Sequence, residues 1–118
     1  MPAVLAMMRK LRLSLLCAIG LFVVAPSFAQ QVTEIHLTYS KGQFQPKEVS
    51  APADKPISFR IKNLDAKAME FESKTLKVEK VVAGSSDATI NVRAQKPGRY
   101  EFFDEYNEKV ARGALVVK

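Results

Sequence analysis

The stretch "YEFFDEYNEKVARGALVV", from Tyr100 to Val117, decides the fold class. Tyr100 and Phe102 are separated by one residue, which is the period-2 pattern of a strand with one buried face. A polar loop follows, and Gly113 then opens a closing apolar segment. An alternating strand, a loop and an apolar strand in this order predict the last hairpin of a small β-sandwich.

The same alternation marks the segments before this hairpin. Strands are expected at 33–39, 55–63, 68–73, 88–94, 98–106 and 113–118. In the first of them, Ile35, Leu37 and Tyr39 share one face, which we expect to be buried. The segment 71–82 leaves a strand and a short helical turn both open, because Leu76 and Val78 fit either. About seven short strands without a strong helix predict an all-β antiparallel sandwich.

The N-terminal segment has the features of an export signal. Three basic residues precede an apolar run at 13–25, and small residues follow at the two positions that a signal peptidase reads, Ser27 and Ala29. The apolar run is shorter than the roughly 20 residues that a bilayer span needs. We therefore predict cleavage after Ala29, a signal peptide at 1–29, a single domain at 30–118 and a periplasmic location.

Removal of the signal peptide changes the chemistry that the chain offers. Cys17 is the only cysteine and lies in the apolar run, so the exported chain is expected to have neither a disulfide nor a thiolate ligand. The net charge of the whole chain is +6, and three of its basic residues precede Ala29. The basic residues that remain are scattered among acids, which argues against nucleic-acid binding.

The order of these signals resembles the cupredoxin family across nearly the whole predicted domain. "FQPKEVSAPADKPISFRIKNLD" (44–65) looks like the first half of that family, and "KPGRYEFFDEYNEKVARGALVV" (96–117) looks like its last hairpin. The resemblance implies a cupredoxin-like, Greek-key β-sandwich. Electron-carrying members hold copper through two His, a Cys and a Met.

Those four ligand positions fall near Met69, Asp104, Asn107 and Ala111 in this chain. A blue-copper site requires a thiolate and two imidazoles, and none of the four residues supplies either. We therefore reject electron transfer through type 1 copper.

A narrower group fits the residues better. The segments "AMEFES" and "LKVEKVVAGSS" and the last hairpin resemble a cupredoxin-like domain that is found at the start of EfeO-type iron-uptake proteins. The same domain also occurs as a small periplasmic protein that accompanies Ftr/Efe-class iron permeases. The resemblance implies an iron or copper ion as cofactor. It also implies an inner-membrane iron permease and a periplasmic iron-binding protein as partners.

Carboxylates gather where the resemblance would place a metal. The candidate ligands are Met69, Glu70, Glu72, Glu79, Asp104 and Glu105. Carboxylates with a single thioether suit Fe³⁺, Mn²⁺ or Cu²⁺ and disfavour Cu⁺, which prefers sulfur.

A second interpretation of these residues stays open. Glu70 and Glu72 alternate with Met69 and Phe71, so strand geometry allows the two carboxylates to point into water and Met69 to lie in the core. Two functions follow. The leading one is a metal-binding protein of an iron-uptake system, and the alternative is a metal-free, Ig-like sandwich that acts as an interaction module.

An enzyme is not expected from this sequence. His36 is the only imidazole, and the sequence does not pair it as a base with a nucleophile. The sequence also has no glycine-rich loop of the kind that binds phosphate.

Overall fold

The computed structural model describes residues 20–23 and 31–118. The predicted cleavage after Ala29 and most of the predicted signal peptide lie outside the described residues. The described ranges contain no helix that is long and apolar enough to cross a membrane.

Nine strands and one short 3-10 helix form the described domain. They are β1 (Thr33–Ser40), β2 (Gln43–Gln45), β3 (Glu48–Ala51), β4 (Ile57–Asn63), β5 (Met69–Ser73), β6 (Val78–Val82), β7 (Asp87–Val92), β8 (Gly98–Asp104), η1 (Glu105–Asn107) and β9 (Arg112–Val117). The alternation of buried and exposed residues that predicted the strands is clearest in β5, where every second residue is buried. The expected all-β sandwich is confirmed.

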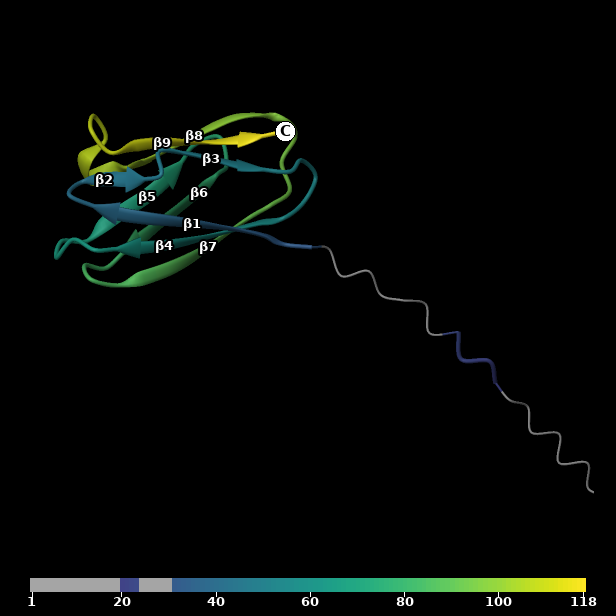
Figure 1. The fold of residues 1–118 in the computed structure, drawn as a ribbon. Coiled ribbons are helices and arrows are strands. Elements are labelled where there is room, and N and C mark those ends of the chain that lie inside the picture. The colour runs from purple at the N-terminus through teal and green to yellow at the C-terminus, as the bar shows by residue number, and fades with distance from the viewer. Residues whose placement is uncertain (1–19, 24–30) are drawn as a thin grey trace, which may run out of the picture.

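Two mixed sheets make up the sandwich (Figure 1). One sheet has the strand order β2-β1-β4-β7, and the other has the order β3-β9-β8-β5-β6. Most neighbouring strands are antiparallel, as expected, but β1 pairs with β4 and β3 pairs with β9 in parallel. β1 and β4 can run parallel because the chain leaves β1 through β2, crosses to the other sheet as β3 and returns as β4. The two short strands of this crossover were not expected from the sequence.

The segment that the sequence left undecided is a strand hairpin. β5 and β6 pair antiparallel, with Phe71 opposite Lys80 and Glu72 opposite Glu79. The residues between them form a turn in which Lys77 has a φ of 57° and Leu76 packs into the core. Leu76 therefore belongs to neither a helix nor a strand.

The core between the sheets is built around aromatic rings. Phe44, Phe59, Phe71 and Phe102 are fully buried. The ring centroids of Phe44 and Phe102 lie 5.0 Å apart and those of Phe71 and Phe102 lie 5.2 Å apart, within the range of favourable aromatic pairs. Because Phe71 is anchored inward from the middle of β5, its two neighbours, Glu70 and Glu72, must face outward.

Candidate metal centre

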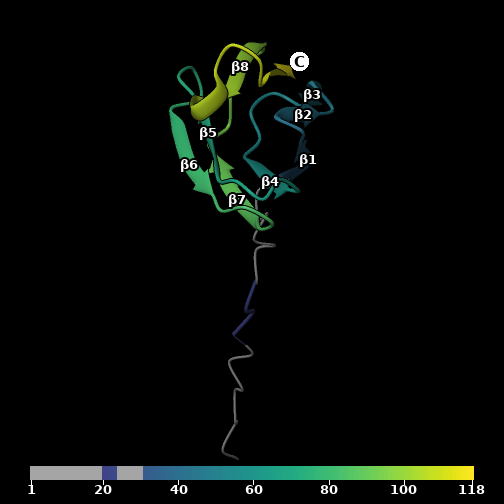
Figure 2. The ribbon, with the colours of Figure 1, turned by 90° about the vertical axis from the view of Figure 1, so that its left-hand side faces the viewer.

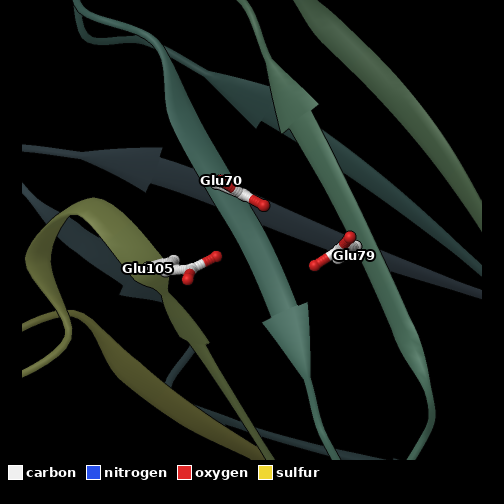
Figure 3. A group of neighbouring side chains, drawn as sticks. All are labelled: Glu70, Glu79 and Glu105. Atoms are coloured by element: carbon white, nitrogen blue, oxygen red, sulfur yellow. The ribbon is translucent and has the colours of Figure 1, made fainter.

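Three carboxylates converge on the outer face of the five-stranded sheet. Glu70 comes from β5, Glu79 from β6 and Glu105 from η1, and Figure 3 shows their side chains turned toward one another. One oxygen of each residue lies within 4.8 Å of the others. Metal–oxygen bonds of about 2.0–2.6 Å place two ligand oxygens at most about 5 Å apart. The three oxygens therefore lie at separations that a single ion can span.

Sheet register brings these residues together. On the outer face of β5, Glu72 lies opposite Glu79 of β6, and Glu70 is two residues away on the same face. Phe71 of β5 pairs with Asp104 at the end of β8, so the next residue, Glu105, begins η1 beside the outer face of β5. Glu105 thus shares one surface with Glu79 and Glu70, which lie 26 and 35 positions earlier in the chain.

Electrostatics in this cluster disfavour the ionised forms of Glu70 and Glu105. Partial burial and then the charge of Glu105 raise the pKa of Glu70. A hydrogen bond with Glu72, and then the charge of that carboxylate, raise the pKa of Glu105. Desolvation and the nearby charge of Glu70 also raise the pKa of the Tyr106 hydroxyl. Carboxylates that repel one another in this way bind a proton or a metal cation more readily than isolated ones.

Asp104 lies in a different environment, although it is the next residue to Glu105. Its side chain is buried, with 2% of the residue exposed. One oxygen accepts hydrogen bonds from the backbone N–H groups of Glu70, at 2.9 Å, and Tyr106, at 3.0 Å. The other accepts from the Tyr39 hydroxyl at 2.5 Å. This carboxylate thereby caps η1 and joins β1, β5 and η1.

The Tyr39 hydroxyl is held by the same network. Tyr39 is 4% exposed, and burial followed by the hydrogen bond to Asp104 raises the pKa of its phenol. Asn107 donates a long 3.4 Å hydrogen bond to the Gly42 carbonyl. Tyr39, Asp104 and Asn107 line a hollow of about 540 Å³ at the loop end of the sandwich. Its buried polar side chains are occupied by hydrogen bonds within the protein.

The structure separates the predicted ligands into two groups. It brings together Glu70, Glu79 and Glu105, and Glu72 lies close enough to raise the pKa of Glu105. Met69 has no exposed surface and packs in the core, on the opposite face of β5 from Glu70. Asp104 lies in the hydrogen-bond network described above. A single ion cannot contact both Met69 and the outer-face cluster without rearrangement of β5.

Sequence reasoning missed the part that Tyr39 plays. The residue was expected on the inner face of the first strand, where it lies, but its hydrogen bond reaches a residue 65 positions away. No local pattern identifies such a partner. His36 lies on the opposite face of β1 with a largely exposed side chain, 3.8 Å from Glu34.

The chain matches the model of one protein family, described as the cupredoxin-like domain, over residues 13–117. Among curated proteins, an uncharacterised protein of Rickettsia prowazekii (strain Madrid E) is 33% identical over 86 residues, which is 73% of this chain and 69% of that protein. Both matches span most of the domain described above.

Solved structures with the same arrangement of strands include copper proteins. Auracyanin A, a "blue" copper protein of Chloroflexus aurantiacus, superposes with a TM-score of 0.63 at 16% identity, covering 75% of this chain and all of that one. The metal-binding domain of the Cu(I)-exporting P-type ATPase of Streptococcus pneumoniae D39, solved with Cu(I), has a TM-score of 0.62 at 15% identity, covering 76% and 98%. At these identities the likeness establishes a shared fold.

Proposed function

The chain belongs to the cupredoxin-like domain family, and from that premise we propose that it is a periplasmic protein that binds a metal ion through outer-face carboxylates and serves an iron-uptake system. The observation that supports this most strongly is the convergence of Glu70, Glu79 and Glu105, with one oxygen of each within 4.8 Å of the others. The raised pKa values of Glu70 and Glu105 add to it. Repulsion by neighbouring carboxylates contributes to both shifts, after desolvation for Glu70 and the hydrogen bond with Glu72 for Glu105, and a cation relieves that repulsion.

The donor set selects the class of ion. Carboxylate oxygens suit hard and borderline ions such as Fe³⁺, Mn²⁺ and Cu²⁺, whereas Cu⁺ prefers sulfur. Met69, the one thioether of the domain, is buried on the other side of the sheet. We therefore assign the proposed site to iron or to Cu²⁺ rather than to Cu⁺.

Exposure of the cluster fits delivery of metal better than permanent storage. Glu79 and Glu105 are exposed, and three carboxylates leave coordination positions open to ligands from outside. A partner can therefore approach a bound ion directly. The partners proposed are an inner-membrane iron permease and a periplasmic iron-binding protein.

A metal-free interaction module is the second candidate function, and one observation favours it. Leu64, Tyr106 and Val110 are 53%, 60% and 56% exposed, and all three lie in the loops and η1 outside the strands. A contiguous patch of such side chains is typical of a surface that contacts another protein. In this alternative the carboxylates are solvated and bind nothing.

Calorimetric titration separates the two functions. The purified, metal-free protein is titrated with Cu²⁺, Fe³⁺ and Mn²⁺ in a non-chelating buffer, beside a Glu70→Gln, Glu79→Gln double variant. The matched control is a Glu34→Gln, Glu48→Gln double variant, which removes the same charge from carboxylates that pair with arginines elsewhere. The metal site is supported if binding is saturable and becomes at least tenfold weaker in the Glu70→Gln, Glu79→Gln variant but not in the control variant. No saturable heat with any ion would overturn it and favour the interaction module.

A further inference from the structure

A second cleft lies at the seam where the edges of the two sheets meet. β6 is the edge strand of the five-stranded sheet and β7 is the edge strand of the four-stranded sheet, and Figure 2 shows the two side by side. The cleft has a volume of about 540 Å³. Its lining residues are Thr75, Leu76, Lys77, Val78, Asn91, Arg93, Ala94 and Gln95. They come from the β5–β6 turn, the start of β6 and the end of β7 with the segment after it.

The charge of this cleft is entirely positive. Lys77 and Arg93 are the charged residues of its lining, which includes no carboxylate. Among the arginines that the structure describes, Arg60, Arg99 and Arg112 each form an ion pair with a glutamate, whereas Arg93 forms none. The guanidinium of Arg93 is therefore free to bind an anion from solution.

Neutral donors surround the two cations. The amide side chains of Asn91 and Gln95 and the hydroxyl of Thr75 line the same cleft. In the described residues, β6 and β7 each have a strand partner on one side only. The other edge of each strand therefore presents backbone N–H groups that make no hydrogen bond to a neighbouring strand. Val78, which is partly buried against the core, supplies an apolar surface beside these polar groups.

We propose that this cleft binds a phosphate group carried on a larger molecule. A phosphate monoester carries a charge close to −2 near neutral pH, which the charges of Lys77 and Arg93 balance. Arginine presents a planar fork of donors that matches two phosphate oxygens, and lysine adds a point charge. The volume exceeds what phosphate alone occupies, and the partly buried Val78 offers contact to the organic part of the ligand.

This site is separate from the proposed metal centre. Lys77 also borders a smaller hollow that includes Glu72 and Glu79, but no ion pair joins it to either carboxylate in the described part of the chain. Arg93 lies on the segment after β7, away from that hollow. Absence of metal binding would therefore not contradict the phosphate site, and absence of phosphate binding would not contradict the metal site.

Titration with inorganic phosphate, followed by amide chemical shifts, tests the proposal. Sodium chloride at equal ionic strength is the solvent control. We expect saturable shifts confined to residues 75–78 and 91–95, with at least tenfold weaker binding in a Lys77→Gln, Arg93→Gln double variant. A Lys62→Gln, Lys109→Gln double variant removes the same charge outside the cleft and should bind like the unmodified protein.

Vesicle flotation then distinguishes the two sources of phosphate. Binding to vesicles that contain phosphatidic acid, a lipid phosphate monoester, but not to pure phosphatidylcholine vesicles, abolished only in the Lys77→Gln, Arg93→Gln variant, identifies an anionic lipid headgroup. Saturable phosphate binding without vesicle binding identifies a soluble phosphate ester. Absence of saturable shifts, shifts reproduced by chloride, or equal weakening in both double variants would overturn the site.

Discussion

Asp104 and Glu105 are neighbours in the chain, yet their carboxylates lie in opposite environments. Asp104 is buried and accepts hydrogen bonds from Tyr39, Glu70 and Tyr106. Glu105 is exposed and lies among other carboxylates. A carboxylate surrounded by donors is already satisfied and holds the fold together, whereas carboxylates that face one another lack donors and attract cations. The surroundings of an acidic residue, rather than its place in a predicted metal loop, therefore decide its role.

Replacement of Asp104 should reduce the stability of the protein more than replacement of Glu105. An Asp104→Ala variant leaves the Tyr39 hydroxyl and the backbone N–H groups of Glu70 and Tyr106 without their acceptor. Each unpartnered buried donor costs about 1–3 kcal/mol, so we expect the free energy of unfolding to fall by about 3–5 kcal/mol. Urea unfolding measures this loss. A Glu105→Ala variant is the control, and similar losses in the two would contradict the contrast.

Tyr39→Phe removes one partner from the same network and should have a smaller effect. A hydrogen bond to a charged acceptor contributes about 1.5–3 kcal/mol, and Phe keeps the packing of the ring. We therefore expect a loss within that range, again by urea unfolding. A loss as large as that of Asp104→Ala would show that the tyrosine, rather than the carboxylate, organises the loop end.

Alkaline pH should weaken the protein through Tyr39. Burial and the Asp104 hydrogen bond raise the pKa of this phenol, so the folded state keeps a proton that the unfolded state loses near pH 10. The unfolded state then binds fewer protons, and stability falls as the pH rises above about 10. The difference in stability between pH 8 and pH 11 should shrink in Tyr39→Phe, measured by urea unfolding. An unchanged difference would refute this assignment.

The outer-face cluster should respond to pH in the acidic range. The pKa values of Glu70 and Glu105 are raised in the folded state. At a pH just above the ordinary pKa of 4.5, the folded state therefore still holds protons that the unfolded state has released. Stability of the metal-free protein therefore falls as the pH rises from 4.5 through the raised pKa values. A Glu70→Gln, Glu105→Gln variant should lose this contribution, so its melting temperature should exceed that of the unmodified protein at pH 7. No difference at pH 7 would mean that the carboxylates do not repel.

Much of the sandwich could be predicted from alternation alone, because strands with one buried face place an apolar residue at every second position. The pattern located Phe71 and Phe102 in the core and fixed the fold class. It missed β2 and β3, which are three and four residues long and lie on the crossover between the sheets. Alternation needs more residues than these strands contain.

The candidate site was predictable as a set of residues but not as a geometry. Met69 and Glu70 are consecutive in a strand, so the alternation itself indicates opposite faces, and the structure places them there. Asp104 and Glu105 are consecutive acids in the sequence, and only the tertiary contact with Tyr39 distinguishes them. Likewise, the meeting of Glu79 with Glu105 depends on pairing across β6, β5 and β8.

The central claim is that metal binds to the outer-face carboxylates and not at the buried loop end, where Met69 begins β5 directly after Ala68 of the hollow. A paired calorimetric titration of Glu79→Gln and Met69→Leu with Cu²⁺ tests it most directly, because Met69→Leu conserves volume and should cost less than about 1.5 kcal/mol of stability. We predict at least tenfold weaker binding in Glu79→Gln and unchanged binding in Met69→Leu. Weaker binding in Met69→Leu with unchanged binding in Glu79→Gln would contradict the claim and place the metal at the loop end.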